Sequence, residues 1–434
     1  MADVKPFRAI RPKEGLERRI AALPYDVYSR EEAKREVERE PLSFLRIDRA
    51  ETQFADDVDA YADMVYEKAR DLLWGMVENG ELVEEAGECY YVYELVMDGR
   101  PQTGIAACSS VDDYLHQVIR KHENTREDKE IDRIRHVDVC QAQTGPIFLA
   151  YRSHPVIQEE VERACKEKPL YDFTASDGIA HRIWRIGEAG AVDKIRKAFR
   201  EVDRIYIADG HHRCASAVKV SLKRREADPG STGKEEFNYF LSVLFPDDQL
   251  MIMDYNRVVK DLNGLEKEEL MRRIAENFLV EKTGPEPYRP QEKGCFGMYL
   301  EDGWYRLKIK EMIREEQDEG HPEKRLDVAV LQDKLLAPIL GIQDPKTDKR
   351  IDFVGGIRGL EELERRVHMD AAVAFSLYPT SVEELFAVAD AGQLMPPKST
   401  WFEPKLRSGL LIHKIERERR NCAGGSAGTE DVYE

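Results

Sequence analysis

Five consecutive residues, Asp209, Gly210, His211, His212 and Arg213, combine side chains that bind anions and move protons. The apolar run before them predicts a short buried strand, and the stretch after them predicts a helix. Gly210 allows a sharp turn between the two and lets the backbone approach a ligand closely. The first turn of a helix presents unpaired N–H groups and the positive end of the helix dipole, which suit phosphate. The segment therefore predicts a phosphate-binding turn.

The side chains of this turn have separate candidate roles. Arg213 can hold two phosphate oxygens at once, and His211 and His212 can donate hydrogen bonds or transfer protons near neutral pH. Asp209 can cap the helix, orient a histidine or bind Mg²⁺. The alternative is an Asp cap beside two surface histidines, and the spacing alone favours neither reading.

A second cluster begins at His122 and Glu123 and continues to Asp132 and Arg133. Its acid, base and cation predict a catalytic carboxylate at Glu123 and substrate-binding groups at the other three positions. Asp132 and Arg133 cannot share one helix face with all the other members, so the cluster is expected to straddle a turn. A solvated, charged helix is the alternative.

Two further segments carry unusual polar residues. Asp26 follows an aromatic residue in an otherwise apolar run, which makes it a second candidate for proton transfer or else a turn residue. Lys398, Ser399 and Thr400 follow two prolines, which stiffen the loop that presents them. Such a loop can close over an anionic ligand, so all three are candidate phosphate-binding residues. The same residues are also compatible with a packed loop that only connects two elements.

The composition excludes several classes of protein. The chain has 434 residues, with 66 Lys and Arg against 84 Asp and Glu, which gives a formal net charge of −18. A protein that coats nucleic acid needs a cationic surface, so we expect no nucleic-acid partner. No apolar stretch approaches the roughly 20 residues of a membrane span, so we expect no membrane partner. A local anion site fits this charge, and the negative surroundings favour Mg²⁺.

Two features predict a cytoplasmic location. The segment MADVKPFRAIRPKEG at the start lacks the apolar core of a signal peptide. The 7 cysteines include no pair at CxxC spacing, which is typical of reduced thiols rather than of a disulfide framework or a structural zinc site.

Strands and helices alternate irregularly along the chain. The pattern of apolar and polar residues predicts helices at residues 54–76, 112–124, 156–167, 265–279 and 381–390. It predicts strands at residues 90–97, 204–208, 237–245, 250–259 and 371–378. Asp98-Gly99, between two extended runs, indicates a hairpin with a tight turn. Several hairpins without a regular βαβ series predict an α+β fold, with mixed and antiparallel sheets and flanking helices.

Five segments of the sequence have unusual combinations of residues. They are ALPYDV (22–27), PLSFLRI (41–47), HENT (122–125) with DR (132–133), ADGHHRCASA (208–217) and MPPKSTWFEPKLRSGL (395–410). In combination they resemble the bacterial and archaeal domain-of-unknown-function family 1015, also described by its HHR motif. The resemblance runs from about residue 5 to about residue 412. The family's usual aromatic residue after HHR is Cys214 here.

The DGHHR element in turn resembles the phosphate-gripping motif of the ParB/sulfiredoxin superfamily, a strand–turn–helix that ends in Arg. That superfamily includes free-serine kinases, CTP switches and sulfiredoxins, and members of family 1015 are often associated with serine-biosynthesis genes. The resemblance implies a nucleotide-dependent phosphotransferase acting on serine or phosphoserine. Its cofactors would be a nucleotide (ADP or ATP) and Mg²⁺, and its ligand a small phosphorylated metabolite. In a pathway without an ordinary phosphoserine phosphatase, the reaction could run toward serine.

In this hypothesis, N–H groups of the helix bind phosphate together with Arg213 and one histidine. Lys398 closes over the leaving phosphate, and Asp209 holds Mg²⁺. Glu123 or Asp26 takes the hydroxyl proton in the kinase direction and returns it in reverse.

Two alternatives belong to other classes of function. One is a nucleotide-binding regulatory protein without turnover, comparable to a ParB-type switch. The other is a metal-dependent phosphohydrolase that uses His211 and His212, although adjacent histidines on a helix rarely bind one metal.

The resemblance extends over nearly the whole chain, which favours one catalytic unit, residues 1–416, over separable modules. The charged stretch 222–236 is the best position for a boundary between two subdomains within it. Residues 417–434 are expected to form a flexible tail. The sequence leaves the oligomeric state open, a homodimer included.

Overall fold

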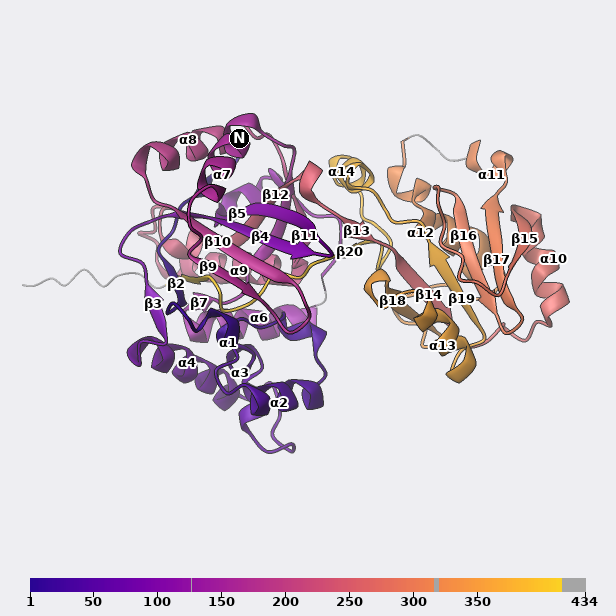
Figure 1. Cartoon of the computed structure of the whole chain (residues 1–434), viewed down its shortest axis with the longest axis horizontal. Coiled ribbons are helices and arrows are strands. Elements are labelled where there is room, and N and C mark those ends of the chain that lie inside the picture. The colour runs from indigo at the N-terminus through magenta and orange to yellow at the C-terminus, as the bar shows by residue number, and fades with distance from the viewer. Residues whose placement is uncertain (126, 316–319, 416–434) are drawn as a thin grey trace, which may run out of the picture.

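Two lobes of unequal size form the molecule (Figure 1). The computed structural model describes residues 1–125, 127–315 and 320–415; the expected tail lies outside these residues. The larger lobe holds the chain up to Gln249 and the last described strand, and the smaller lobe holds residues 255–390. Between them, β13 (Ile252–Met253) pairs antiparallel with β20 (Trp401–Phe402).

A nine-stranded mixed sheet forms the centre of the larger lobe. Two of its neighbouring pairs, β11 with β6 and β12 with β8, are parallel, and the other pairs are antiparallel. The strands in order across the sheet are β6 (Ile119–Arg120), β11 (Ile205–Asp209), β8 (Ile147–Tyr151), β12 (Tyr239–Pro246), β5 (Arg100–Ser110), β4 (Tyr90–Met97), β10 (Ala180–Ile186) and β9 (Tyr171–Thr174), with β1 (Val4–Lys5) paired to β5.

Helices cover one face of this sheet, and side chains on the other face belong to a core that continues into the smaller lobe. Because side chains alternate along a strand, β11 sends Ile205 and Ile207 into the core beneath the helices, while Tyr206 and Ala208 join the core that continues into the smaller lobe. The helices are α5 (Val111–Leu115), α7 (Pro155–Cys165), α8 (Ala189–Phe199) and α9 (His211–Ala227), followed by η3 (Glu236–Asn238) and η4 (Asp247–Gln249) beside β12.

A small antiparallel sheet and a group of helices complete the larger lobe. The strands in order are β3 (Leu82–Glu84), β2 (Ala9–Pro12), β21 (Ile412–Lys414) and β7 (Ala142–Gln143). The helices are α1 (Glu17–Ile20), η1 (Tyr25–Val27), α2 (Arg30–Arg39), α3 (Leu45–Asp48), η2 (Ala50–Gln53), α4 (Asp63–Glu78) and α6 (Glu127–Cys140). Their apolar faces share one core with Ile10 and Ile412.

The smaller lobe is an antiparallel six-stranded sheet with helices around it (Figure 1). The strands in order are β15 (Phe278–Gly284), β17 (Gly303–Ile309), β16 (Cys295–Leu300), β19 (Val373–Leu377), β14 (Tyr255–Val259) and β18 (Ile351–Gly355). The helices are α10 (Lys267–Asn277), α11 (Glu311–Glu315), η5 (Pro322–Arg325), α12 (Asp327–Leu331), η6 (Gln332–Leu336), η7 (Gly356–Arg358), α13 (Glu361–Met369) and α14 (Val382–Asp390).

The α+β class with mixed sheets and flanking helices is confirmed. The hairpin of β4 and β5 is also confirmed, and its turn residues Asp98 and Gly99 both have positive φ, 51° and 78°. The predicted strand–turn–helix is present as β11, Gly210 and α9. The stretch 222–236 lies inside the larger lobe, from the last turns of α9 to η3, and the division into subdomains stays a prediction.

Three predicted elements differ from the structure. The helix predicted at 54–76 begins only at Asp63, because the aspartates before it form turns; Asp59, for example, accepts from the N–H of Tyr61. The helix predicted at 112–124 is the short α5 followed by β6. The strand predicted at 250–259 is divided into β13 and β14, where the chain passes between the lobes.

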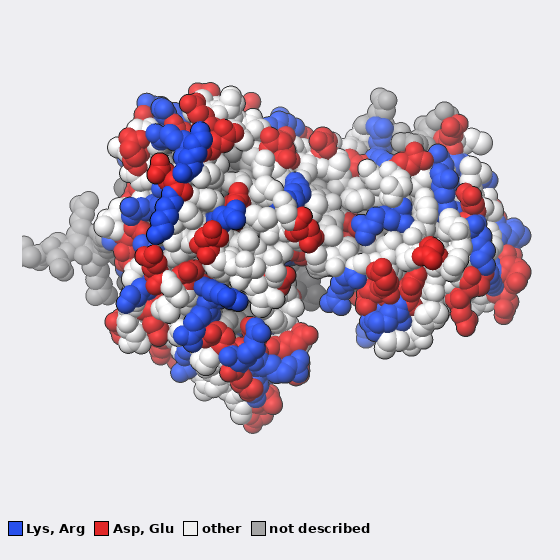
Figure 2. Space-filling view, viewed as in Figure 1, with Lys and Arg blue, Asp and Glu red and all other residues white. Residues whose placement is uncertain are grey.

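On the face shown in Figure 2, Lys and Arg are interspersed with Asp and Glu over both lobes. None of the described helices is long and apolar enough to cross a membrane.

Candidate functional site

The turn between β11 and α9 has the geometry that its sequence predicts. Gly210 lies in the left-handed region, with φ 90° and ψ 30°. Its N–H donates to Oδ1 of Asp209 (2.9 Å). The positive φ favours glycine here, and a Cβ at Gly210 would lie 3.1 to 3.3 Å from the guanidinium of Arg213, which would have to shift.

A cavity of about 700 Å³ opens beside this turn and is lined by both lobes. The larger lobe contributes Asp26 from η1, His122 and Glu123 after β6, and Asp209 at the end of β11. The smaller lobe contributes β14, β18, η7 and α13 through the residues Tyr255, Asp352, Phe353, Val354, Gly355, Ile357, Arg358, Glu362 and Arg366. The site therefore needs both lobes.

The segment that returns from the smaller lobe, residues 395–405, forms a further wall of the cavity. Lys398, Ser399 and Thr400 line it, as do Trp401 and Lys405. Seven of the residues singled out from the sequence thus lie around one cavity. They are Asp26, His122, Glu123, Asp209, Lys398, Ser399 and Thr400.

Lys405 pairs with Asp209 inside the cavity. Its Nζ lies 3.2 Å from Oδ2 of Asp209 and 4.8 Å from the centre of the Trp401 ring. Although burial opposes ionisation of Asp209, Lys405 and Arg213 hold the pKa of its carboxyl well below the usual range. Burial likewise disfavours the ammonium, but Asp209 and Glu403 raise the pKa of Lys405. Both side chains are therefore charged at neutral pH.

Two histidines from different segments meet behind this pair. The rings of His122 and His211 pack edge to face, with centroids 4.6 Å apart, and only 2% of His122 and 7% of His211 is exposed. Burial lowers the pKa of His122 to about 4 and, together with His122, lowers the pKa of His211 well below its usual value. Both rings are neutral at pH 7. Nδ1 of His122 and Nε2 of His211 are buried without a hydrogen-bond partner among the described residues.

The return segment is fixed at several backbone positions. The N–H of Met395 donates to the carbonyl of His122 (2.8 Å), and the buried Arg257 donates from Nη2 to the carbonyl of Lys398 (3.0 Å). The hydroxyl of Ser399 donates to the carbonyl of Pro396 (2.6 Å), which closes the loop. The Lys398 side chain remains exposed. Ser399 thus shapes the loop, while Lys398 reaches the cavity.

Arg213 and Arg133 line a different and much smaller cavity of about 30 Å³. Nη1 of Arg213 donates to the carbonyl of Pro146 (2.6 Å), and the Arg133 guanidinium lies 4.0 Å from the centre of the Tyr25 ring. A space of this size holds about one water molecule. Arg213 therefore packs beneath Gly210 and braces the turn from the side away from the large cavity.

Four predicted residues lie outside the lining of both cavities: Gly210 and His211, which are described above, and Asp132 and His212. Asp132 accepts a hydrogen bond from the hydroxyl of Tyr66 (2.8 Å) and one from Arg133. It lies on α6 with Arg133, past the loop that carries His122. His212 is half-buried in the first turn of α9, where its carbonyl accepts from Ser216 (2.7 Å). Among the described residues, no group of three or more His, Cys, Asp or Glu side chains forms a metal site.

Lys405 is the main residue that the sequence interpretation missed. It stands within the family-like segment at 395–410, but its position after a proline resembles an ordinary surface lysine. One signal was available: a charged residue enclosed by aromatic and apolar neighbours, as Asp26 is. Glu403 was missed in the same way; burial raises the pKa of its carboxyl, which accepts from Nε1 of Trp401 (3.0 Å).

Comparisons with known proteins place this geometry in context. A search of the curated proteins finds no match. Similar solved structures include SbnI with a C-terminal truncation from Staphylococcus aureus, 14% identical with a TM-score of 0.37 over 71% of this chain and 87% of that one. They also include a free serine kinase variant in complex with ADP, 14% identical with a TM-score of 0.35 over 71% and 92%. Similarity at this level carries no functional argument.

The comparison with protein families identifies one family model that matches this chain. The model of the family "Protein of unknown function (DUF1015)" matches residues 4–329, which include the turn at Gly210, His122 and Asp26. The match spans the whole of the nine-stranded sheet and most strands of the smaller lobe. Because it takes in well over half of the chain, the chain belongs to the DUF1015 family.

Proposed function

We propose that the chain is a nucleotide-dependent phosphotransferase that acts on serine or phosphoserine. The observation that carries the proposal is the cavity of about 700 Å³ between the lobes, where a helix-initiating turn, two lysines and several carboxylates meet. Its volume lies within the range of small-molecule sites, about 300 to 1,000 Å³. A nucleotide and an amino acid can share such a space.

Phosphate groups would bind at the end of β11. Lys398 and Lys405 supply positive charge from the return segment, and the start of α9 supplies backbone N–H groups and the helix dipole. The neutral His122 has a buried Nδ1 without a described partner, and it can accept or donate a hydrogen bond according to its tautomer. Nη1 of Arg213 donates to the carbonyl of Pro146 beside the turn, and phosphate binding by Arg213 stays a prediction.

Proton transfer would fall to a carboxylate. In the kinase direction, the serine oxygen attacks the γ-phosphorus of ATP, the bond to the β-phosphate oxygen breaks, and Asp26 or Glu123 takes the hydroxyl proton. In reverse, the same carboxylate returns the proton to the serine oxygen while ADP receives the phosphoryl group. Asp26 is exposed at the cavity wall, which suits a group that must meet a substrate.

The residues present also fit Mg²⁺. This ion is held by one or two carboxylates together with phosphate oxygens and water, rather than by a full protein cage. Asp209 is ionised at the cavity wall, and Glu123 lines the same space. When bound, Mg²⁺ would neutralise the charge of the phosphates.

The direct test is turnover in both directions. The purified protein is incubated with serine, ATP and Mg²⁺, and separately with phosphoserine, ADP and Mg²⁺, and all four metabolites are quantified by mass spectrometry. We expect phosphoserine and ADP in the first reaction, and serine and ATP in the second. Asp26→Asn and Glu123→Gln identify the base, because replacing it should reduce kcat about 10²- to 10⁴-fold.

Other results would redirect the proposal. Nucleotide binding without turnover would identify a regulatory protein. Release of phosphate from phosphoserine in the absence of nucleotide would identify a phosphohydrolase. The function proposed here would be refuted if the protein turns over neither substrate pair and binds neither nucleotide nor phosphoserine in calorimetry.

A further inference from the structure

Asp209 has one partner at each carboxylate oxygen. Oδ1 accepts from the N–H of Gly210 (2.9 Å), and Oδ2 pairs with Nζ of Lys405 (3.2 Å). The first contact belongs to the backbone of the turn and is fixed. The second comes from a side chain with four rotatable bonds, so it can be exchanged.

The surroundings of Lys405 are held in place. Trp401, beneath the ammonium, donates from Nε1 to Glu403 (3.0 Å), and its ring packs on the backbone of β18, where a Cβ at Gly355 would lie 2.6 Å away. About 15% of the Lys405 side chain is exposed, and it lines the large cavity. The ammonium can therefore move toward the cavity more easily than away from it.

A phosphate at this turn creates a problem of charge. It would lie near the ionised Asp209, and the repulsion between two anions is strong where little water intervenes. A cation that already neutralises Asp209 and also reaches the cavity removes this repulsion. A divalent cation at Oδ2 would do the same, but it would compete with Lys405 for that oxygen.

We propose that Lys405 is an exchangeable counterion, which neutralises Asp209 in the ligand-free protein and moves to the phosphate of a bound phosphate ester or nucleotide, leaving Oδ2 of Asp209 to a divalent cation. The inference rests on the proposed function, since it takes the phosphate as the incoming anion. It gives Lys405 two successive partners and explains how one site accommodates an anion and a metal ion.

The exchange predicts effects of opposite sign for the two ligands. Without Lys405, Oδ2 of Asp209 has no cation in contact and only Arg213 offsets the carboxylate charge, so the empty site attracts cations more strongly and repels phosphate. In Lys405→Met, the affinity for ADP without divalent cation should fall roughly ten- to hundredfold, which is the usual contribution of a hydrogen bond to a charged group. With saturating Mg²⁺ the loss should be below about threefold, because the metal replaces the missing charge.

The experiment combines two titrations. ADP binding to the full chain is measured by calorimetry with EDTA and with Mg²⁺, and Mn²⁺ binding without nucleotide is measured by electron paramagnetic resonance. Mn²⁺ affinity should rise in Lys405→Met and return to the original value or below in the double variant Lys405→Met, Asp209→Asn. Lys414→Met is the matched control, because its Nζ lies 5.4 Å from the Trp74 ring and outside the cavity lining.

The outcomes separate this inference from the function itself. If the wild-type protein binds no nucleotide under either condition, the proposed function fails, and the exchange fails with it. If the wild-type protein binds ADP but Lys405→Met loses equal affinity with and without Mg²⁺, and Mn²⁺ binding is unchanged, Lys405 is a fixed structural partner of Asp209. Thermal unfolding of the double variant is the control for misfolding. If its site is folded, it should unfold at nearly the wild-type temperature, because both charges of the pair are absent.

Discussion

The hydroxyl of Tyr206 donates a hydrogen bond to Oδ1 of Asp390 (2.9 Å), which joins β11, the strand next to the edge strand β6 in the larger lobe, to the last residue of α14 in the smaller lobe. Its ring also stacks on Phe386, with centroids 3.8 Å apart. Arg120, Arg152 and Arg204 surround the same carboxylate at 3.2, 3.2 and 2.9 Å. Because Tyr206 lies three residues before Asp209 on β11, this contact fixes the smaller lobe close to the site.

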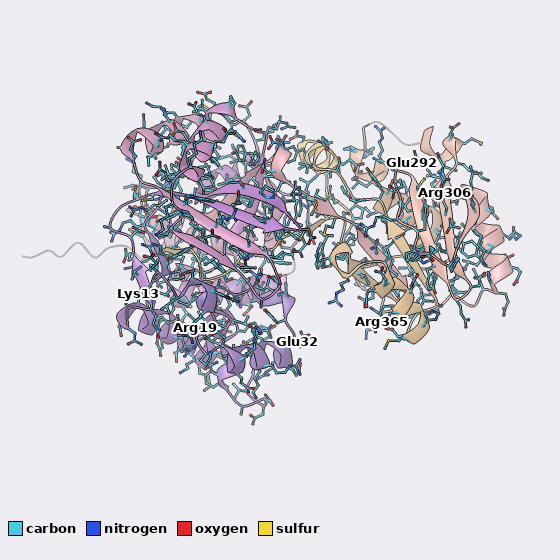
Figure 3. All side chains as sticks on the ribbon, viewed as in Figure 1. Lys13, Arg19, Glu32, Glu292, Arg306 and Arg365 are labelled. Carbon is cyan, nitrogen blue, oxygen red and sulfur yellow. The ribbon has the colours of Figure 1, made fainter. Side chains whose placement is uncertain are left out.

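Asp390→Asn should loosen the junction between the lobes. The charged hydrogen bonds at this half-exposed position contribute about 1 to 2 kcal/mol. We expect a lower free energy of unfolding in urea and a broader distance distribution in small-angle X-ray scattering. Glu292→Gln is the control, since Glu292 and Arg306 lie on the smaller lobe away from the junction (Figure 3). An unchanged scattering profile in Asp390→Asn would show that the apolar stack alone holds α14.

Gly210→Ala should damage the site more than the fold. A non-glycine residue at φ 90° costs about 1 to 2 kcal/mol, and the new Cβ would press on Arg213 at 3.1 to 3.3 Å. Gly15→Ala is a matched control, because Gly15 has φ 89° and open space around it. Both variants should lose stability in thermal unfolding, but Gly210→Ala alone should lose nucleotide affinity, about tenfold or more by calorimetry. Equal binding by the two variants would contradict a ligand at this turn.

The buried His122 should make the protein less stable as the pH falls. Its folded pKa of about 4 lies below the unfolded value of about 6.5. The unfolded chain therefore binds the proton first, and the stability present above pH 6.5 is lost as the pH falls toward 4. This one group should cost about 2 kcal/mol between pH 7 and pH 5. Urea unfolding of the wild type and His122→Asn at both pH values measures it.

The variant His122→Asn tests whether His122 causes this loss of stability. In His122→Asn the loss of stability between pH 7 and pH 5 should be smaller by that amount. His211, which packs on His122 and has a lowered pKa as well, would still titrate in the unfolded chain and contribute its own share. An identical pH dependence in the two proteins would mean that His122 has the same pKa in the folded and the unfolded protein.

Arg257→Met should release the return segment. The buried guanidinium of Arg257 donates to the carbonyls of Pro397 and Lys398 (3.4 and 3.0 Å) and to that of Tyr255. Burial lowers the pKa of Arg257 to about 10, so it remains charged at pH 7. Amide hydrogen exchange at residues 395–402 should accelerate at least tenfold, while the Lys398 side chain is unaltered. Unchanged exchange would assign the rigidity of the segment to its prolines and to Met395.

The sequence predicted those elements whose conformation depends on residues close together in the chain. The hairpin at Asp98-Gly99 and the turn at Gly210 depend on positive φ, which these residue types adopt readily, so the sequence marks both. The helix expected at 54–76 has the right apolar spacing throughout, yet aspartates before Asp63 satisfy backbone groups in turns. Periodicity alone cannot register that competition.

The sequence pointed to many of the residues that line the large cavity, but not to how they are arranged around it. Asp26, Glu123, Asp209 and Lys398 come from four segments, and no spacing along the chain indicates that both lobes would line one cavity. Arg213 has the expected place in the motif, but its guanidinium packs under the turn because the carbonyl of Pro146 accepts from it. Lys405 was missed because its partner lies almost two hundred positions away.

The position of β21 also sets an order of events during synthesis. This strand is the last described element, and it lies between β2 and β7, which are made much earlier. The smaller lobe is complete before β21 leaves the ribosome, whereas the larger lobe must wait with an open sheet edge for its final strand. Lys405 and the return segment emerge just before that strand. The cavity is therefore completed only after both lobes have been made, because residues of the return segment form one of its walls.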